Sequence, residues 1–462
     1  MDTRVQGLLN QPALARLAEW SAGTEFEGQL WIVGGAVRDA LLARHNPGDF
    51  DLVREGDVMG LTTRLYEAGV SSIFPVQYPR FGTARVQIAD TAIEFVSARG
   101  ESYDEHSRKP HVRPATLRDD VYRRDFTCNS LLLNLHTGEI RDETGQGLSD
   151  LEAGILRTPL DPRQTMIDDP LRILRTVRFA TQLGFGYAPG LAETVQEQAG
   201  QLAHISHERI RDEFVKIVVN PRATFGLREM MRLGICDVVL PELVATVGVE
   251  QGSFHHLDVW EHSLAVLDYA NQGNLRDNLA ALFHDIAKPQ TRSVDPDGRV
   301  RFFGHEVEGA KLTDQILRRL KFPGDLISDV CTLVRHHMRL GTAHSFSIVA
   351  ARRLVRDLDS LVDPLLHLVE ADIHGCKPGA PKVQLGPIRD QIARVQLETP
   401  AALLRSPIDG REVMEILDIP PGKAVGEALH WLSEQVIEGT LDAHDKASAR
   451  EKLRSDYRPG TL

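Results

Sequence analysis

The stretch that decides the fold runs from Leu30 to Val53 and reads LWIVGGAVRDALLARHNPGDFDLV. Its apolar start, Leu30–Val33, predicts a buried strand, and the glycine pair that follows ends that strand. The next residues, Ala36–Ala43, predict a short helix with Arg38 in its first turn. Backbone N–H groups at such a glycine turn, together with a helix N-terminus, favour the binding of a phosphate.

Two carboxylates follow this turn. Asp49 and Asp51 flank Phe50, and side chains two positions apart on a strand point to the same face of a sheet. Paired carboxylates are suitable ligands for Mg²⁺ beside a triphosphate. The stretch therefore predicts a nucleotide site in which Gly35 and Arg38 contact phosphate, while the catalytic pair Asp49 and Asp51 holds Mg²⁺.

This pattern resembles the nucleotidyltransferase head of class II tRNA nucleotidyltransferases (CCA-adding enzymes) and of bacterial poly(A) polymerases. In the rest of the head we expect a helix at Val58–Ala68 and strands at Leu52–Val53, Ser72–Val76, Thr83–Ile88, Ala92–Ser97 and Leu131–Leu135. Glu94 lies in one of these strands, either as a third metal-binding carboxylate or as a solvent-facing residue.

The stretch 99–118 is polar and has no hydrophobic period, so we expect a solvated loop there. In the resembling family a flexible loop occupies this place and helps the switch to adding A. The spacing of Asp104 and Arg108 is similar to the pattern of that loop.

A second motif, at residues 119–131, reads DDVYRRDFTCNSL. Arginine binds phosphate with two hydrogen bonds, so we expect Arg123 and Arg124 to bind the triphosphate. Asp125 and Asn129 are able to hydrogen-bond a ribose hydroxyl, and the 2′-OH is the group that distinguishes NTP from dNTP. The string resembles the sugar and triphosphate motif of the same family.

A third motif, DDPLRILRTVRFA, begins at Asp168 in a region where the pattern has become helical. Arg172, Arg175 and Arg178 recur at every third position, a spacing that also fits an amphipathic helix with a solvated basic face. The segment resembles the nucleotide-selection motif of the family, with Asp168 in place of the usual Glu, and the resemblance implies that Arg175 and Arg178 also bind the nucleotide. Cytosine and adenine each present an amino donor beside a ring-nitrogen acceptor, so we expect Asp169 and Arg172 to select these two bases.

The segment from Ser206 to Lys216 begins another helix and resembles the last family motif, for which we expect a structural role in the neck. Basic helix faces further along the chain are candidates for RNA phosphate contact, although solvated faces fit the pattern equally well. These faces contain Arg318, Arg319, Lys321, Arg352, Arg353 and Arg356.

Histidines and aspartates cluster in the second half of the chain. The expected metal ligands are His262, His284, Asp285, His305, His336 and Asp372, and Lys288 is expected to lie near a phosphate. A lone His-Asp pair is common, but this whole string resembles the HD-domain metal-dependent phosphohydrolases. Imidazoles and carboxylates without a thiolate suit Mg²⁺, Mn²⁺, Ni²⁺ or Co²⁺, and a bridging Asp285 is able to hold two metals that activate water.

The composition restricts the class of protein. The chain has 462 residues, 42% hydrophobic and 26% charged, which is ordinary for a globular protein of two to four domains. Its net charge of −12 argues against a generally basic nucleic-acid-binding protein, so RNA contacts must come from local basic surfaces. Four widely separated cysteines, with no apolar run of membrane-spanning length, predict a cytoplasmic protein that does not enter a membrane.

The resemblance covers nearly the whole chain and implies an α+β fold, with a small nucleotidyltransferase head followed by mostly helical segments. The expected segments are an N-terminal extension with one amphipathic helix (1–28), the head (29–147), a helical neck (148–240), an HD domain (241–376) and a helical tail (377–462). It implies a monomer or homodimer that acts on tRNA and uses CTP and ATP.

The resemblance implies untemplated addition of the 3′-terminal CCA, and a 2′,3′-cyclic phosphodiesterase or phosphatase activity in the HD domain. The alternatives are a poly(A) polymerase, and an enzyme that adds only CC or only A. A phosphohydrolase or RNA-binding regulator with an inactive head is a further alternative, against which the intact carboxylates and arginines of the head argue.

Overall fold

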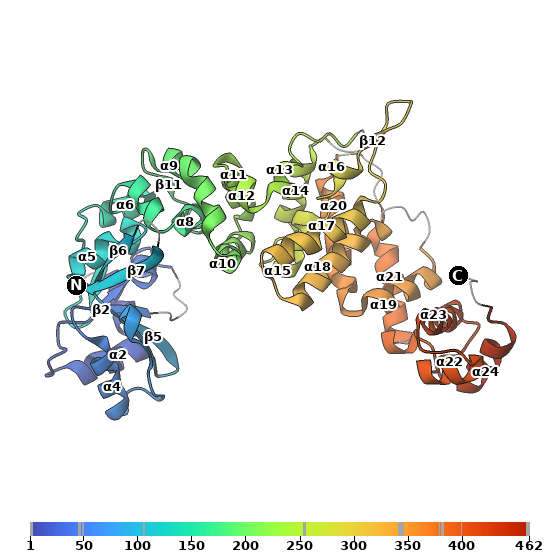
Figure 1. The fold of residues 1–462 in the computed structure, drawn as a ribbon, viewed down its shortest axis with the longest axis horizontal. Helices are drawn as coiled ribbons and strands as arrows, with labels where there is room; N and C mark the ends of the chain where they lie inside the picture. Colours follow the sequence, from blue (N-terminus) through green and yellow to red (C-terminus); the bar gives the residue numbers. More distant parts are fainter. Residues whose placement is uncertain are drawn as a thin grey trace. The chain divides into compact units, whose positions relative to one another are not determined.

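The computed structural model describes residues 3–44, 48, 50–104, 107–252, 256–340, 346–377, 379, 383–398 and 400–458. The chain forms two compact units, residues 1–239 and 240–462. Strands gather in the blue, N-terminal part of the first unit, and the second unit consists mostly of helices (Figure 1). The α+β fold class is thereby confirmed.

The head contains one seven-stranded sheet in the order β3-β4-β5-β2-β1-β8-β9. Its strands are β1 (Trp31–Val33), β2 (Phe50–Arg54), β3 (Val76–Tyr78), β4 (Thr83–Ile88), β5 (Thr91–Ser97), β8 (Leu132–Asn134) and β9 (Ile140–Arg141). Asp51 of β2 pairs with Val33 of β1 on one side and with Glu94 of β5 on the other. Directly paired residues project from the same face of a sheet, so Asp51 and Glu94 lie side by side on one face.

Helices cover the two faces of this sheet unequally. The face that bears Phe50 and Phe95 is buried beneath α2 (Pro12–Ser21) and α4 (Val58–Glu67). The face that bears Asp51 is covered by α5 (Leu117–Tyr122) only over β1, β2 and β8. There, Leu117 and Val121 of α5 pack against Trp31, Val33, Val53 and Leu132.

Three expectations for the head were wrong in detail. The strand expected at Ser72–Val76 begins only at Val76, and the N-terminal extension forms two helices, α1 (Thr3–Leu9) and α2, instead of one. The stretch expected to be a loop forms the antiparallel hairpin β6 (Arg99–Asp104) and β7 (Ser107–Pro114). A hairpin is held by main-chain hydrogen bonds, so its strands need no apolar alternation in the sequence.

The rest of the first unit is helical. α7 (Pro162–Asp168) ends where Asp169 takes an extended backbone conformation, and α8 (Leu171–Leu183) begins just after Pro170. α8 packs against α10 (His207–Val218) and α11 (Ala223–Arg232), and it ends at Gly184, whose φ of 79° favours glycine.

The second unit begins with a helical bundle. Its main helices are α14 (Val259–Ala270), α15 (Leu275–Phe283), α17 (His305–Arg319), α18 (Gly324–His336) and α20 (Val362–Gly375). α14 packs on α15 and α20, and α18 packs on α15 and α17 (Figure 1). This packing brings together histidines that are widely separated in the sequence.

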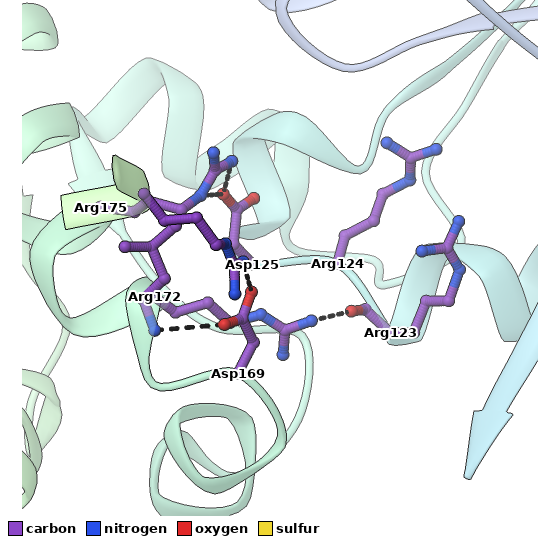
Figure 2. Close-up of a pocket in the computed structure, with 8 residues that line it drawn as sticks. Arg123, Arg124, Asp125, Asp169, Arg172 and Arg175 are labelled. Carbon is purple, nitrogen blue, oxygen red and sulfur yellow. Dashed lines mark hydrogen bonds and ion pairs between the residues drawn. The ribbon is translucent and has the colours of Figure 1, made fainter. Parts of the chain in front are cut away.

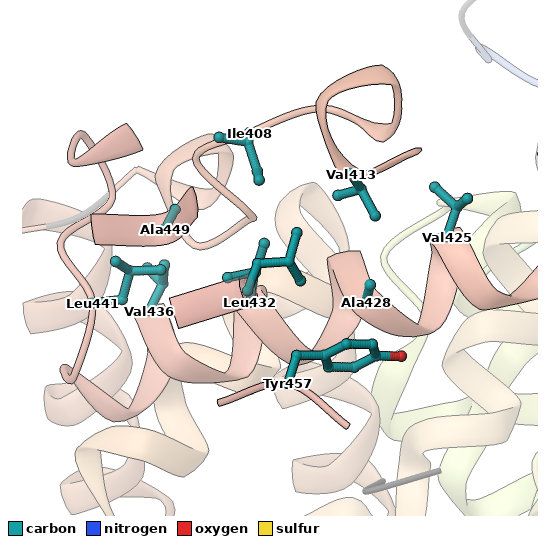
Figure 3. Close-up of a cluster of buried hydrophobic side chains, with 10 residues drawn as sticks. Ile408, Val413, Val425, Ala428, Leu432, Val436, Leu441, Ala449 and Tyr457 are labelled. Atoms are coloured by element: carbon teal, nitrogen blue, oxygen red, sulfur yellow. The ribbon is translucent and has the colours of Figure 1, made fainter. Parts of the chain in front are cut away.

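The C-terminal helices form a small core of their own. α22 (Gly410–Leu417), α23 (Lys423–Glu438) and α24 (Lys446–Ser455) enclose Val413, Leu432 and Ala449 (Figure 3). Arg353 and Arg356 of α19 (Ile348–Leu358) pair with Glu434 of α23. These two arginines therefore hold α23 against α19, a role that neither of the sequence-based alternatives included.

Candidate functional site

The glycine turn of the head brings the backbone close to a carboxylate. Gly34 has a φ of 81°, a conformation that favours glycine, and it is the N-cap of α3 (Gly35–Leu41). A Cβ placed on Gly34 would lie 3.6 Å from an Asp51 carboxylate oxygen and 3.9 Å from a guanidinium nitrogen of Arg124. Asp51, with Glu94 beside it in the sheet, is thus near the turn, whereas Asp49 lies outside the described residues.

Arg38 of α3 is buried and linked to the second motif. Its guanidinium donates to Asn129 Oδ1 at 2.6 Å and to Asp39 Oδ1 at 2.8 Å. Asn129 in turn donates from Nδ2 to Asp125 Oδ1 at 3.1 Å. Arg38 and Asn129 therefore connect the glycine turn to the arginine motif within the protein.

The two arginines of the second motif are oriented by one buried carboxylate. Arg123 donates to Asp120 Oδ1 at 2.9 Å, and Arg124 donates to Asp120 Oδ2 at 2.8 Å. Burial would raise the pKa of Asp120, but both arginines outweigh that effect and hold its pKa below the usual value. No such role for Asp120 was expected from the sequence, although it precedes Arg123 and Arg124 by only three and four residues at the end of α5, which brings both guanidinium groups within its reach.

Asp125 is a second buried carboxylate in this region. It accepts hydrogen bonds from Arg175 of α8 and from the backbone N–H of Phe126, the latter at 2.8 Å. Burial would raise its pKa, yet the charge of Arg175 prevails and holds the pKa of Asp125 well below its usual range. Asp125 therefore stays ionised and joins the head to α8.

Asp169 and Arg172 line the same pocket, but in the contacts that the structure shows their side chains bind other groups. Asp169 accepts from the Leu171 N–H at 3.2 Å and from Arg209 of α10 at 2.9 Å. Arg172 donates to the carbonyl oxygens of Thr165 and Arg123, at 3.1 Å and 2.5 Å. The purely structural role expected for the segment that contains Arg209 is therefore incomplete, because Arg209 holds the predicted base-selecting carboxylate.

These contacts form a pocket between the head and α8 (Figure 2). Its lining residues are Arg123, Arg124, Asp125, Asp169, Leu171, Arg172, Arg175 and Arg209. Five arginines against two aspartates make the lining positive, as binding of a triphosphate requires. The pocket thus brings together six of the residues predicted to bind the nucleotide.

Arg178 does not line this pocket. It is 7% exposed and forms an ion pair at 2.5 Å with Glu213 of α10, which is itself 4% exposed. The guanidinium also stacks over the Phe179 ring at 3.7 Å. The prediction that placed Arg178 among the nucleotide contacts is corrected: the structure places this residue between α8 and α10.

The histidines of the second unit surround one aspartate. His284 Nε2 lies 3.1 Å from Asp285 Oδ2, and His305 Nε2 lies 3.3 Å from Asp285 Oδ1. The Asp285 carboxylate therefore faces two groups of possible ligands, one on each oxygen. These are His262, His284 and Asp372, and His305 with His337.

The prediction of His336 as a ligand was wrong by one residue. His337 is 1% exposed, and its Nε2 lies 3.2 Å from His305 Nε2, whereas His336 is not in either group. α18 ends at His336 and His337 opens a short 3₁₀ turn, so the helical phase of the sequence does not identify which histidine points inward. Burial lowers the pKa of His337 to about 3, which keeps its imidazole neutral.

The chemistry of this cluster fits divalent metal ions. Nδ1 of His284, His305 and His337 lies 2.9, 2.7 and 2.7 Å from a backbone carbonyl oxygen. A carbonyl only accepts, so Nδ1 carries the proton and Nε2 presents a lone pair to the centre. Asp285 Oδ1 is buried and has no hydrogen-bond donor among the described residues. A cation bound between this oxygen and the histidine Nε2 atoms would satisfy it.

Lys288 lies at the edge of the cluster. Its ammonium donates to Asp285 Oδ2 at 2.6 Å and to Gln251 Oε1 at 2.5 Å, and it is 7% exposed. In the structure Lys288 therefore balances the charge of the central carboxylate. Its expected contact with a phosphate stays a prediction.

Comparison with known proteins agrees with both sites. Residues 30–157 match the Poly A polymerase head domain, residues 184–246 a probable RNA and SrmB-binding site of polymerase A, and residues 259–368 the HD domain. A CC-adding tRNA nucleotidyltransferase of Thermus thermophilus is 34% identical, over 90% of this chain and 92% of its own. The chain belongs to the tRNA nucleotidyltransferase family. The family resemblance seen in the sequence is confirmed.

One further relative and one solved structure are similar to this chain along nearly its whole length. An A-adding tRNA nucleotidyltransferase of Deinococcus radiodurans is 33% identical, over 93% of this chain and 96% of its own. The fold also matches the crystal structure of the Bacillus stearothermophilus CCA-adding enzyme in complex with CTP, with a TM-score of 0.66 over 98% of both chains and 22% identity. Proteins with these head and HD domains generally use divalent metals. No helix of the described residues is long and apolar enough to cross a membrane.

Proposed function

We propose that this enzyme adds the 3′-terminal CCA to tRNA from CTP and ATP, with protein side chains in place of a template. The observation that carries the proposal is the arginine-lined pocket that also contains Asp169. We assign the triphosphate to Arg123, Arg124 and Arg175. The amino group of the base is assigned to Asp169 and its ring nitrogen to Arg172.

We assign the catalytic metal to the carboxylates near the glycine turn, where Asp51 and the pocket residue Arg124 both approach Gly34. Asp51 would hold Mg²⁺ together with Asp49 and Glu94, and the register of β2 and β5 supports the third of these ligands. Mg²⁺ held there would supply stabilisation of the charge on the α-phosphate. The three arginines assigned to the triphosphate would hold the leaving pyrophosphate, because each is fixed by a buried carboxylate.

A second candidate function follows from the relatives. Two that match along nearly the whole chain are named CC-adding and A-adding enzymes, so a division of CCA addition between two enzymes is the main rival. Poly(A) polymerase is the other rival, because the head domain carries that name.

One experiment separates these functions. tRNA transcripts that end before CCA, after CC or after CCA are incubated with CTP, ATP or both, and products are resolved at single-nucleotide resolution. A CCA-adding enzyme extends the first by three residues and the second by one, and leaves the third unchanged. A CC-adding enzyme stops after two residues, an A-adding enzyme extends only the second transcript, and a poly(A) polymerase adds many A residues to all three.

We further propose that the cluster around Asp285 is a second, phosphohydrolase site. His262, His284 and Asp372 would hold one divalent ion, His305 and His337 another, and Asp285 would bridge them. Such a pair of ions supplies an activated water for hydrolysis of a 2′,3′-cyclic phosphate or a 2′-phosphate. Hydrolysis assayed with Mg²⁺, Mn²⁺, Ni²⁺ and Co²⁺ tests this proposal, and the absence of hydrolysis with every metal contradicts it.

The four free cysteines support the expected cytoplasmic location.

A further inference from the structure

Among the described residues, no helix covers one part of a sheet face in the head. The face that bears Asp51 is covered by α5 over β1, β2 and β8, but on that face the side chains of β3 and β4 and those of Ala92 and Glu94 of β5 are exposed or half-buried. We call this region the open sheet face; its residues are Val76, Tyr78, Arg85, Gln87, Ala92 and Glu94. On the other face of the same strands, Ala84, Val86 and Ile93 are buried.

The open sheet face and the turn beside it expose large apolar side chains. Val76 is 48% exposed, Tyr78 is 52% exposed, and Phe81 in the following turn is 46% exposed. Exposed aromatic groups so close together on a protein commonly mark a binding surface. Aromatic rings on a sheet surface are platforms on which single-stranded bases stack.

A cation lies in the middle of this surface. Arg85 of β4 is exposed and pairs in register with Val76 on one side and Glu94 on the other. Among the described residues Arg85 forms no ion pair, unlike Arg64 of α4, which pairs with Glu25. An exposed guanidinium beside aromatic groups is suited to a phosphate of a single strand.

The open sheet face also begins at the catalytic carboxylates. Glu94 and Asp51 are neighbours in one row across the sheet, and that row continues outward through Arg85 to Val76. From Asp51 in the other direction, the next groups are the glycine turn and Arg124, and the nucleotide pocket begins at Arg124. In phosphoryl-type transfer, the attacking and leaving oxygens lie roughly in line on opposite sides of the phosphorus.

We propose that the open sheet face holds the last nucleotides of the RNA acceptor, with a base stacked on Tyr78 and a phosphate paired with Arg85. The pyrophosphate is held on the arginine side, so the acceptor 3′-OH approaches the α-phosphate from the side of β3, β4 and β5. This inference rests on the proposed transferase function and assigns its acceptor strand to named residues.

The test measures steady-state addition by the full-length protein to a tRNA transcript that lacks CCA. We expect Tyr78→Ala and Arg85→Ala each to raise the KM for tRNA about tenfold, with the KM for CTP unchanged. Arg85→Ala should also reduce the slope of log KM for tRNA against log salt by about 0.7, the value for one phosphate contact to a single strand. Arg85→Lys should restore most of that slope, and Arg64→Ala on the other side of the sheet is the matched control.

The outcomes separate this inference from the function on which it rests. If the parent protein adds nucleotides while the Tyr78 and Arg85 variants keep the parent KM for tRNA and the parent salt slope, the inference is wrong and the surface serves another partner. An increase in the KM for CTP equal to that for tRNA also contradicts it, because the effect is then not on the acceptor strand. A parent protein that extends no tRNA transcript overturns the proposed function instead.

Discussion

At Asp169, two donors fix the orientation of one carboxylate. The Leu171 N–H binds Oδ1 and the Arg209 guanidinium binds Oδ2, so the remaining lone pairs of both oxygens are presented in a defined direction. A carboxylate held in this way accepts from the amino group of cytosine or adenine and refuses the carbonyl that uracil and guanine present instead. Under the proposed assignment, base selection would depend on Arg209 as well as on Asp169 and Arg172.

We predict that Asp169→Ala reduces incorporation of CTP and ATP and makes incorporation of UTP or GTP detectable. The loss of a hydrogen bond to a charged group costs about 1.5–3 kcal/mol, roughly tenfold to a hundredfold in discrimination. Arg209→Ala should reduce discrimination in the same direction but less, because the Leu171 N–H remains. Kinetics with the four NTPs on one acceptor measure this. Asp168→Ala is the matched control, because the Asp168 carboxylate accepts a hydrogen bond from Gln164 instead. If Asp169→Ala lowers incorporation of all four NTPs equally, the prediction is wrong.

Two adjacent histidines provide a second test at the scale of single residues. His337 lies in the cluster around Asp285 and His336 does not. We predict that His337→Ala weakens binding of Mn²⁺ or Co²⁺ by more than the roughly 10–100-fold that loss of an outer partner causes, whereas His336→Ala leaves it unchanged. Titration calorimetry on the metal-free protein measures both affinities. If His336→Ala weakens metal binding and His337→Ala does not, His336 is the ligand and His337 is not.

Among the helices, α8 and α10 are joined by a buried ion pair that also positions the pocket. Glu213 binds Arg178, and Arg209 lies one turn earlier on α10, where it reaches Asp169. The helix that holds the selecting carboxylate is thus set in place by a contact outside the pocket.

We predict that Glu213→Ala reduces the stability of α8 against α10 by about 3–5 kcal/mol, because Arg178 is left buried without its charge partner. Native-state hydrogen exchange of the α8 amides measures this change. Activity should fall with all nucleotides, and base discrimination should fall in the same direction as for Arg209→Ala, since α10 also positions Arg209. The double variant Arg178→Met, Glu213→Leu should regain part of the stability; a double variant as unstable as Glu213→Ala would contradict the ion-pair explanation.

The elements that the sequence predicted well are those with a strong apolar pattern. The strand at Trp31–Val33, the helix at Val58–Glu67 and the strand at Thr83–Ile88 all match their expected ranges closely. The hairpin of β6 and β7 was missed because polar residues occupy alternate positions as well as the positions between them, so its sequence has no apolar face. β3 was displaced because it is an exposed edge strand, in which burial does not fix the pattern.

The site residues divide in the same way. Motif spacing placed Arg123, Arg124 and Asp169 together correctly in one pocket. It assigned no role to Asp120 and only a structural role to the segment that contains Arg209 and Glu213, because their particular contacts come from burial and from packing between separate elements. Neither of these is visible in a single sequence.

For the whole molecule, the two sites lie in separate compact units, the pocket and Asp51 in residues 1–239 and the Asp285 cluster in residues 240–462. Each unit has its own buried core, so loss of a charge in one site need not disturb the other. The two proposed reactions also share no ligand among the described residues.

We therefore predict that the two activities fail independently. Asp51→Ala should abolish CTP and ATP addition while metal-dependent hydrolysis of 2′,3′-cyclic phosphates keeps the parent rate, because Asp51 has no part in the Asp285 cluster. The double variant His284→Ala, Asp285→Ala should have the reverse effect. Both activities are measured on one preparation of each full-length variant, with circular dichroism to verify that the helices are formed. If Asp51→Ala leaves nucleotide addition within a few-fold of the parent, the assignment of the catalytic metal is wrong. If the double variant loses nucleotide addition as well, the sites are coupled, and the independence that two separate cores imply does not hold.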